Sequence, residues 1–524
     1  MVARDKVSRV DVLDRDACYR ALQTRDPRFD GRLFVGVTST GIYCRPVCPA
    51  RTAKFDNCRF FASAAAAQAA GFRPCLRCRP ETAPEVGSWR GTANTVSRAL
   101  ALIAEGGLDG GEAGVDELAE RLGVGGRQLR RLFQQHLGAS PIAVAQTRRV
   151  LFAKKLIQET RMPMLDVALA AGFGSVRRFN ETFRDLFGRP PSALRRKLAT
   201  ERQTASAGDV GVALRLRYRP PYDWPAMLAF LAARAIAGVE EVKDGVYRRT
   251  VAVDGQLGTV EVTHEPSRDN LVAVVRFPSV RALPAILARV SRVFDIGADI
   301  EAIGAHLSRD PLLAPLLAER PGLRAPGGWE GFELAVRAIL GQQVTVTGAR
   351  RLAERLVATC GEELPAAARA SSDSLTHAFP SPERVAAADL AALGVPAARR
   401  DALTAIAGAA IADPNLFRPL ATVDEALSRL RAIPGIGEWT AQYIALRALR
   451  ESDAFPASDV GLLRGAARRT GGRPTTAALL KRAERWRPWR AYAAQHLWTC
   501  DAAGEPSATE RVAAESRSRA LRYA

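Results

Sequence analysis

Residues 41–50, "GIYCRPVCPA", contain Cys44 and Cys48, and a second pair, Cys75 and Cys78, follows after a gap of 26 residues. Two short loops with this spacing can supply four thiolates to a tetrahedral zinc ion. The simpler interpretation is a purely structural zinc. However, four thiolates around one Zn2+ carry a formal charge of about −2, so a metal-bound sulfur keeps nucleophilic character. The spacing predicts one zinc ion and leaves open whether a ligand also reacts.

The charge of the whole chain favours a polyanionic partner. Its 524 residues include 75 Lys and Arg against 55 Asp and Glu, a formal net charge of +20, which is typical of proteins that bind nucleic acid. No apolar run is long enough to span a bilayer, and residues 1–14 contain no hydrophobic core of a signal peptide. We therefore expect a cytoplasmic protein with no membrane partner, in which clustered cysteines bind a metal.

The sequence pattern changes several times along the chain, and the length alone predicts roughly three or four domains. We expect a multidomain protein that is mainly α with α+β parts. Strand-like runs after residue 210 are interrupted by helical stretches at 223–236 and 282–294. The predicted units are a cysteine-rich unit (1–84), a helical unit (92–198), an α+β unit (210–322), an all-α unit (323–505) and a carboxy-terminal tail (506–524).

The helical unit contains an internal repeat. "DELAERLGVGGRQLRRLFQQHLG" (116–138) aligns with "DVALAAGFGSVRRFNETFRDLFG" (166–188) at an offset of fifty positions, so that Phe133 aligns with Phe183. The pattern predicts a duplicated unit of a short helix, a glycine-containing turn and a longer helix.

The polar face of each longer helix offers side chains that can contact base edges and phosphates in a major groove. An ordinary solvated helix face is the safer interpretation for one copy alone. Two copies at a fixed distance, in a strongly basic chain, favour DNA binding. The candidate DNA-binding residues are Arg127, Gln128, Arg131, Arg177 and Arg178.

The carboxy-terminal unit has its own DNA-binding signal in "IPGIGEWTAQYIALR" (433–447), where two predicted helices are joined by Pro434, Gly435 and Gly437. The glycines allow backbone N–H groups to approach a phosphate closely, although a plain helix–helix turn would look similar. A single carboxylate, Asp459, follows shortly afterwards. It is a candidate catalytic residue, and a helix N-cap is an alternative that is compatible with this role.

Residues 33–81 resemble the amino-terminal domain of the Ada methylphosphotriester acceptors nearly from end to end. The resemblance implies that all four cysteines ligate zinc and that Cys44 takes a methyl group irreversibly from an alkylated DNA phosphate. Arg45 and Arg73 lie beside the cluster and could hold that phosphate, or could be solvated surface. The helical unit resembles the double helix-turn-helix of AraC-type regulators, which implies a transcription activator with RNA polymerase as a partner.

The region from about Leu214 to Cys500 resembles the AlkA-type 3-methyladenine DNA glycosylases of the helix-hairpin-helix family. The resemblance implies hydrolysis of the N-glycosidic bond of a flipped, alkylated nucleotide, with Asp459 as the catalytic carboxylate. An electron-poor base should stack on aromatic faces. The residues that match the family's aromatic cleft are Phe230, Trp439, Tyr443 and Trp498.

Several positions refine this resemblance. Trp439 occupies the position of the Schiff-base lysine in bifunctional members of the wider fold, which implies a monofunctional glycosylase without lyase activity. Gln343 occupies the position that wedges into the duplex, where the family often has an apolar residue, and Val460 replaces a second aromatic near the aspartate. The hairpin carbonyls around Ile433 and Gly435 could hold a monovalent cation.

These features predict a bifunctional DNA alkylation repair protein and regulator, which accepts methyl groups, activates repair genes and excises alkylated bases. One alternative is a regulator with a structural zinc and a non-catalytic, glycosylase-like DNA clamp. Another is a glycosylase that its amino-terminal half only recruits to DNA. The Pro-Cys-His-Arg motif of O6-methylguanine acceptors does not occur in the sequence.

Overall fold

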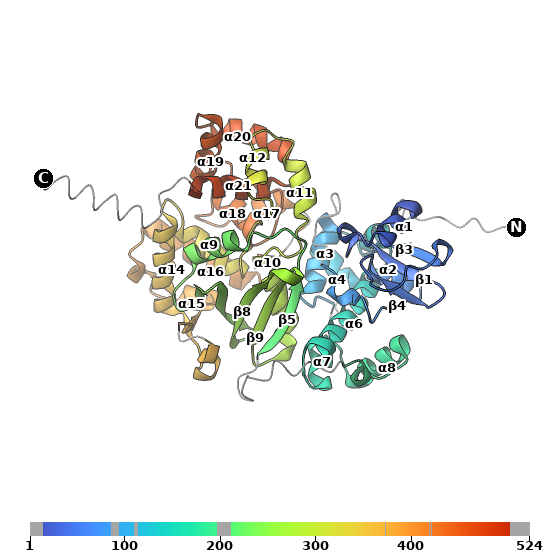
Figure 1. The fold of residues 1–524 in the computed structure, drawn as a ribbon. Coiled ribbons are helices and arrows are strands. Elements are labelled where there is room, and N and C mark those ends of the chain that lie inside the picture. Colours follow the sequence, from blue (N-terminus) through green and yellow to red (C-terminus); the bar gives the residue numbers. More distant parts are fainter. Residues whose placement is uncertain are drawn as a thin grey trace.

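The computed structural model of the chain describes residues 14–84, 94–108, 114–195, 211–371, 374–418, 420 and 422–503. The predicted tail at 506–524 lies outside these ranges. Figure 1 shows the cysteine-rich unit beside the helical unit, with the α+β and all-α units on the far side of the helical unit. None of the helices within the described ranges is long and apolar enough to cross a membrane.

The cysteine-rich unit is built on a four-stranded sheet with strand order β3-β1-β2-β4. Alternate residues of β1 face opposite sides, as the pleat requires: Val35 packs beneath α1, and Phe34 packs against Tyr43. The parallel pairing of β2 with β4 brings Tyr43 opposite Pro74 and so places the two cysteine pairs side by side. The elements are α1 (Arg15–Gln23), β1 (Phe34–Val37), β2 (Ile42–Cys44), β3 (Cys58–Phe61), α2 (Ala64–Ala69) and β4 (Arg73–Pro74).

The helical unit shows the predicted repeat. The two longer helices, α5 and α8, are offset by fifty positions, and they end at Gly138 and Gly188, whose φ angles of 67° and 66° allow the same left-handed cap. Phe133 and Phe183 are fully buried at equivalent positions. The helices are α3 (Asn94–Ala104), α4 (Val115–Arg121), α5 (Gly126–Leu137), α6 (Pro141–Glu159), α7 (Met164–Ala170) and α8 (Val176–Phe187).

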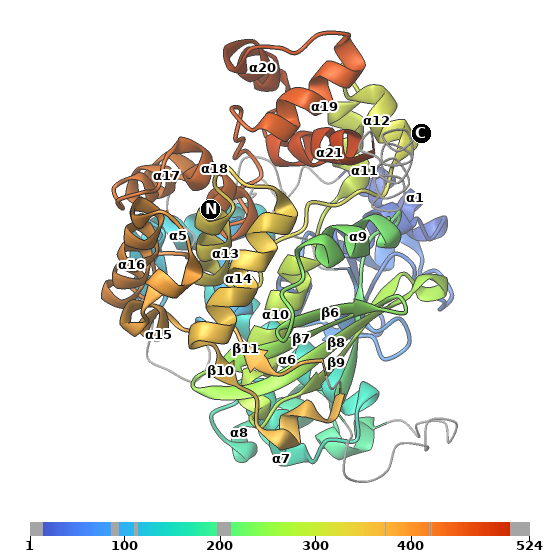
Figure 2. The ribbon, with the colours of Figure 1, turned by 90° about the vertical axis from the view of Figure 1, so that its left-hand side faces the viewer.

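The α+β unit contains a five-stranded antiparallel sheet with order β5-β9-β8-β7-β6. The buried residues Val260 and Val262 alternate along β8, which pairs with β7 and β9. Two helices pack on the sheet, close to the predicted stretches (Figure 2). The elements are β5 (Val212–Arg217), α9 (Trp224–Arg234), β6 (Glu240–Lys243), β7 (Val246–Val253), β8 (Gln256–Glu265), β9 (Asn270–Arg276) and α10 (Leu283–Val293).

The carboxy-terminal unit is helical except for a two-stranded ribbon, and one large buried cluster runs through it. The α+β unit ends with α11 (Ile300–Leu307) and α12 (Ala314–Glu319), which pack into this cluster. The helices of the carboxy-terminal unit are α13 (Gly331–Leu340), α14 (Val346–Cys360), α15 (Pro382–Ala387), α16 (Ala397–Ala412), α17 (Val423–Arg431), α18 (Glu438–Arg447), α19 (Val460–Thr470), α20 (Thr476–Ala483) and α21 (Arg490–Ala503). The ribbon strands are β10 (Glu362–Glu363) and β11 (His377–Ala378).

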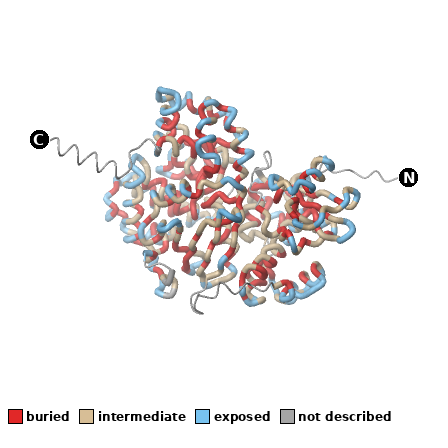
Figure 3. The backbone as a smooth tube through the Cα atoms, viewed as in Figure 1, coloured by how far each residue is buried: buried red, intermediate tan, exposed pale blue. Residues whose placement is uncertain are grey.

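The units pack against one another, and buried residues continue across their boundaries (Figure 3). Phe179 and Phe183 of α8 belong to the same buried cluster as Leu214 and Leu216 of β5. Polar contacts also cross between units. Arg98 of α3 forms a largely buried ion pair with Glu451, which follows α18, at 2.7 Å. The helical unit therefore shares a buried interior with the α+β unit in this structure.

Candidate functional site

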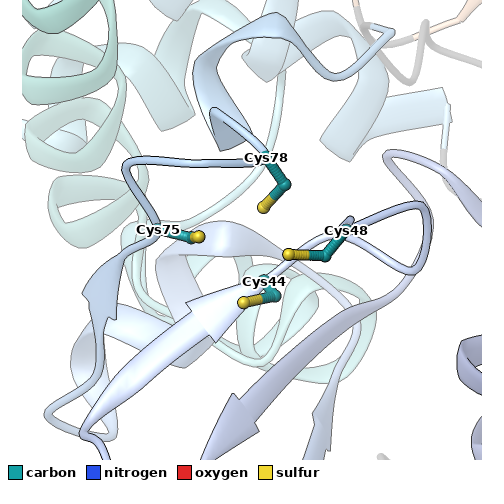
Figure 4. A group of neighbouring side chains, drawn as sticks. All are labelled: Cys44, Cys48, Cys75 and Cys78. Atoms are coloured by element: carbon teal, nitrogen blue, oxygen red, sulfur yellow. The ribbon is translucent and has the colours of Figure 1, made fainter. Parts of the chain in front are cut away.

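The four clustered cysteines converge on one point (Figure 4). Cys44 ends β2, Cys75 follows β4, and the four Sγ atoms all lie within 4.8 Å of one another. Four thiolates bound to one zinc ion stand about 3.8 Å apart, because Zn–S bonds are about 2.3 Å long. The donor set and its spacing therefore fit a metal ion of this kind. Cys48, Cys75 and Cys78 are buried, whereas Cys44 is half-buried.

Crowding separates the pKa values of these thiols. The pKa of Cys75 is lowered, first by a hydrogen bond from Cys44. The pKa of Cys44 is raised, first by its hydrogen bond with Cys48. One sulfur of the set is thus favoured as a thiolate, and the other thiols stabilise it by hydrogen bonding. Metal binding must release the remaining protons, so it couples to pH.

A buried ion pair lies beside the cysteine cluster and is hydrogen-bonded to its backbone. The Arg45 guanidinium, only 2% exposed, pairs with Asp30 and donates to the carbonyl of Cys78 at 3.0 Å and to Thr82 Oγ1 at 2.8 Å. The prediction that Arg45 holds a DNA phosphate is therefore wrong, because its guanidinium is buried and its N–H groups already donate to partners within the cysteine-rich unit. Arg73 is half-buried on β4, and its role stays a prediction.

Lys154 of α6 is a functional candidate that the sequence analysis missed. Its ammonium is fully buried and donates to the Cys75 carbonyl at 3.0 Å and to Glu81 Oε2 at 2.7 Å. Burial lowers the pKa of Lys154, and the charge of Glu81 opposes this shift. Its position between the apolar residues Ala153 and Leu156 was the available signal, because it places a lysine on the buried face of α6.

Replacing Lys154 with Met is expected to destabilise the cysteine-rich unit by about 3 kcal/mol, because the buried Glu81 carboxylate would lose one of the two ion pairs that it forms among the described residues and would keep the pair with Arg79. The measurement is the midpoint of the first thermal unfolding transition of the metal-loaded chain. Lys243→Met, at an exposed position, should shift it little. Equal midpoints for the two variants would contradict the role of Lys154.

The candidate base-reading residues of both repeats are exposed. Arg127, Gln128 and Arg131 lie on α5, and Arg177 and Arg178 lie on α8. The Arg177 guanidinium pairs with Glu181 one helical turn later at 2.8 Å, and both side chains are exposed. The structure thus brings equivalent polar faces to the surface in both copies.

The predicted hairpin joins α17 to α18. Pro434, Gly435 and Gly437 are exposed, and Gly435 has a φ of 83°. A Cβ at Gly435 would also lie 2.3 Å from the Cβ of Ala402, so only glycine fits here. The exposed turn leaves the backbone of these residues accessible to a phosphate.

The loop between α13 and α14 is tied to this hairpin. The side-chain amide of Gln342 donates to the Gly435 carbonyl and to Thr440 Oγ1, both at 3.1 Å. The neighbouring Gln343, the predicted wedge, is exposed at a φ of 57°. The Ile433 carbonyl accepts the Ile436 N–H at 3.1 Å. The monovalent cation at these carbonyls stays a prediction.

Asp459 has the predicted N-cap role and lies beside the predicted aromatic residues, and its catalytic role stays a prediction. It begins α19 as the N-cap, and its Oδ1 accepts the Leu462 N–H at 3.0 Å. The indole nitrogens of Trp498 and Trp439 donate to Oδ1 at 2.8 Å and to Oδ2 at 2.7 Å, respectively. Tyr443 stacks on Trp439 with ring centroids 5.3 Å apart and an interplanar angle of 12°. The carboxylate therefore lies at the edge of the predicted aromatic group.

Arg447, which was not predicted, holds that aromatic group together. Its guanidinium is 2% exposed, and its carbon lies 4.7 Å from the ring centroid of Phe230 and 5.0 Å from that of Trp498. Burial lowers its pKa to about 10. It donates to the Pro326 carbonyl at 2.7 Å and to Gln495 Oε1 at 2.8 Å. Its guanidinium carbon also lies 5.8 Å from the ring centroid of Tyr443, and the i, i+4 spacing of these two residues was the sequence signal for this contact.

Known families match three successive parts of the chain. The metal binding domain of Ada matches residues 17–81, a helix-turn-helix domain matches 118–197, and the AlkA N-terminal domain matches 213–330. These matches agree with the metal-ligand cluster, the exposed repeated helices and the five-stranded sheet.

Similar proteins cover the remaining part. The chain is 44% identical over 487 residues to the "Probable bifunctional transcriptional activator/DNA repair enzyme AlkA" of Mycobacterium tuberculosis (strain CDC 1551 / Oshkosh), covering 93% of this chain and 96% of that protein. It is 39% identical over 288 residues to the DNA-3-methyladenine glycosylase 2 of Escherichia coli (strain K12), covering 54% and 95% of the two chains. It is 36% identical over 139 residues to the bifunctional transcriptional activator/DNA repair enzyme Ada of Escherichia coli (strain K12), covering 26% and 37%.

The similarity to the mycobacterial protein spans nearly the full length of both chains and includes both predicted halves. The chain therefore belongs to the family of bifunctional transcriptional activators and DNA repair enzymes that join an Ada-type metal-binding domain and a helix-turn-helix domain to an AlkA-type glycosylase.

Proposed function

We propose that the carboxy-terminal half is a monofunctional DNA glycosylase that releases alkylated bases such as 3-methyladenine from double-stranded DNA. The observation that carries this proposal is the Asp459 carboxylate, held at the edge of the Trp439, Tyr443 and Trp498 rings. A base alkylated at a ring nitrogen is cationic, so it stacks well on such rings and leaves readily. The enzyme mainly has to stabilise the oxocarbenium-like sugar and position water.

The reaction that this arrangement supports is hydrolytic. The N-glycosidic bond breaks, and its electron pair stays on the base nitrogen. A water oxygen forms the new bond to the sugar carbon, and Asp459 accepts the proton of that water. Trp439 offers an indole N–H where a bifunctional enzyme would need a lysine amine, which supports hydrolysis without a Schiff base.

The hairpin between α17 and α18 and the loop between α13 and α14 provide the proposed DNA contacts of this half. Pro434, Gly435 and Gly437 present exposed backbone to a phosphate. Gln343 stands beside them on a loop that Gln342 fixes to the hairpin. The proposed role of Gln343 is to fill the space that the flipped nucleotide leaves in the duplex.

The proposed role of Cys44 is to accept methyl groups from DNA methylphosphotriesters. It is the half-buried member of an otherwise buried set. The sulfurs of Cys75 and Cys78 accept the backbone N–H groups of Arg77 at 3.3 Å and of Arg45 at 3.4 Å, which draws electron density from them. The Cys48 sulfur likewise interacts with the backbone N–H of Ala50. Exposure and available electron density therefore both favour Cys44.

Zinc, when bound by these four cysteines, keeps their sulfurs deprotonated at neutral pH. In the transfer step the Cys44 sulfur forms a bond to the methyl carbon, and the oxygen–carbon bond of the phosphotriester breaks. The electron pair stays on the phosphate oxygen, which regains its charge. The cysteine becomes a neutral thioether, so the formal charge of the centre changes from about −2 to about −1 and repulsion from the DNA backbone falls.

The helix-turn-helix unit is proposed to activate repair genes by binding promoter DNA and contacting RNA polymerase. The exposed faces of α5 and α8 support this role. We also propose the domain limits 1–84, 92–198, 210–322 and 323–505.

Helices α5 and α8 give a prediction about the salt dependence of DNA binding. Replacing both Arg131 and Arg178 with Ala is expected to reduce the slope of log affinity against log salt concentration by about two, because each phosphate contact contributes roughly one counterion. The measurement is binding of the full chain to an undamaged duplex over a salt series. Arg268→Ala, at an exposed residue of the α+β unit, is the control. An unchanged slope in the double variant would contradict DNA contact through these helices.

The experiment that tests the proposed double function uses duplex DNA carrying radioactive methyl groups. The zinc-loaded chain is incubated with this DNA, and label is counted on the protein and in released free bases. Label in both fractions is the expected result. Label on the protein alone would make the carboxy-terminal half a clamp, and label in free bases alone would make the zinc purely structural.

A further inference from the structure

Two of the residues that match the aromatic cleft also donate hydrogen bonds through their indole nitrogens. Trp439 comes from α18 and Trp498 from α21, yet both turn their indole N–H groups onto the carboxylate of Asp459 at the start of α19. Three helices thus meet at one carboxylate. The indole Nε1–H can only donate, and a carboxylate can only accept while it is ionised.

The two carboxylate oxygens are used unequally. Oδ1 accepts two hydrogen bonds, from the Leu462 backbone and from Trp498, at 3.0 Å and 2.8 Å. Oδ2 accepts one, from Trp439, at 2.7 Å. Each carboxylate oxygen offers about two acceptor sites. Within the described part of the chain, Oδ1 is therefore saturated, and Oδ2 keeps one acceptor site.

The two indole planes are themselves held in place. Tyr443 stacks nearly parallel on Trp439, at an interplanar angle of 12°. The Arg447 guanidinium lies 5.0 Å from the ring centroid of Trp498 and is fixed by its own bonds to Pro326 and Gln495. Since the direction of each N–H follows from the plane of its ring, the surrounding contacts fix both donors.

We propose that Trp439 and Trp498 are positioning residues that clamp Asp459 and leave Oδ2 as its reactive oxygen. This inference rests on the proposed glycosylase function. In the hydrolytic step Oδ2 takes the proton of the attacking water, whose oxygen bonds to the sugar carbon as the electron pair of the broken glycosidic bond goes to the base. The same two side chains face the base with their rings and the carboxylate with their N–H groups, so they fix the distance between base and carboxylate.

The test replaces each tryptophan with Phe, which keeps an aromatic face and removes the N–H. We measure single-turnover release of 3-methyladenine and binding of the same duplex by the full, zinc-loaded chain. Each variant is expected to lose about ten- to a hundredfold in the rate of release, the range for one hydrogen bond to a charged group, while duplex binding changes less than about threefold. Trp486→Phe is the matched control, because it removes an indole bond to a different carboxylate, Asp310, at 2.9 Å.

A double-mutant cycle separates clamping from stacking. In the Asp459→Asn background, Trp439→Phe should lower the residual rate less than about twofold, because the charged acceptor is already gone. The same fold-loss in both backgrounds would overturn the proposal and leave only a stacking role. So would weaker duplex binding with an unchanged rate. An unmodified chain that releases no base would instead refute the proposed glycosylase function itself.

Discussion

Asp459→Asn is expected to lower the release of methylated bases by about a hundred- to a thousandfold, the range for removing a preorganised electrostatic group from an active site. The amide carries no charge to stabilise the oxocarbenium-like sugar. One of its two terminal atoms is also an NH2 donor, which would face an indole donor in place of an acceptor. The measurement is single-turnover release of 3-methyladenine from duplex DNA.

The N-cap role of Asp459 does not confound this experiment. Asn caps a helix about as well as Asp, so α19 should still begin at the same residue. Asp389→Asn is a matched control, because Asp389 caps a short helix elsewhere in the same unit with a bond to the Ala391 N–H at 2.9 Å. A release rate for Asp459→Asn within about twofold of the unmodified chain would show that the carboxylate is not the catalytic group. Methyl transfer to the protein should persist in both variants.

Patterns that depend on spacing along the chain predicted the fold well. The fifty-residue offset placed α5 and α8 and aligned Phe133 with Phe183, because buried positions in a helix recur with its period. The two cysteine pairs converge as expected, since ligand spacing in short loops is a local property.

Features that depend on distant partners were not predictable in the same way. Arg45 follows a cysteine in a basic segment and looked like surface, but Asp30, on an earlier turn, makes it an interior ion pair. The sequence predicts that a base stacks on the tryptophan rings. The direction of their N–H groups, however, depends on how α18, α19 and α21 meet. The orientation of a side chain where three helices meet depends on tertiary packing, so it cannot be predicted from the sequence of one segment.

The packing between units connects the two proposed activities physically. Lys154 contacts the Cys75 carbonyl and Glu81, Glu81 pairs with Arg79, and Arg79 pairs with Glu159 at 3.0 Å. Glu159 in turn accepts the N–H of Arg215 on β5 at 3.2 Å. A continuous series of polar contacts therefore runs from a metal ligand to the sheet of the glycosylase half. This continuity makes it essential to test each activity in the full chain.

Cys44→Ser is expected to abolish methyl transfer to the protein, by at least about a hundredfold, while base release stays within about twofold of the unmodified chain. A serine hydroxyl is nearly the same size as the thiol but ionises far less readily, so it is a poor nucleophile toward a methyl carbon. The measurement is the radioactive methyl label on the protein fraction, with the metal content determined on the same sample.

Cys58→Ser is the matched control for this variant. Cys58 is buried in the same unit, and its Sγ contacts the Lys54 carbonyl at 3.3 Å, outside the cluster. The control should retain both full methyl uptake and its metal. Label that persists in Cys44→Ser on another cysteine would contradict the assignment of Cys44. Loss of label together with loss of metal would attribute the effect to the site as a whole, whereas loss of label with the metal retained identifies the Cys44 sulfur as the methyl acceptor.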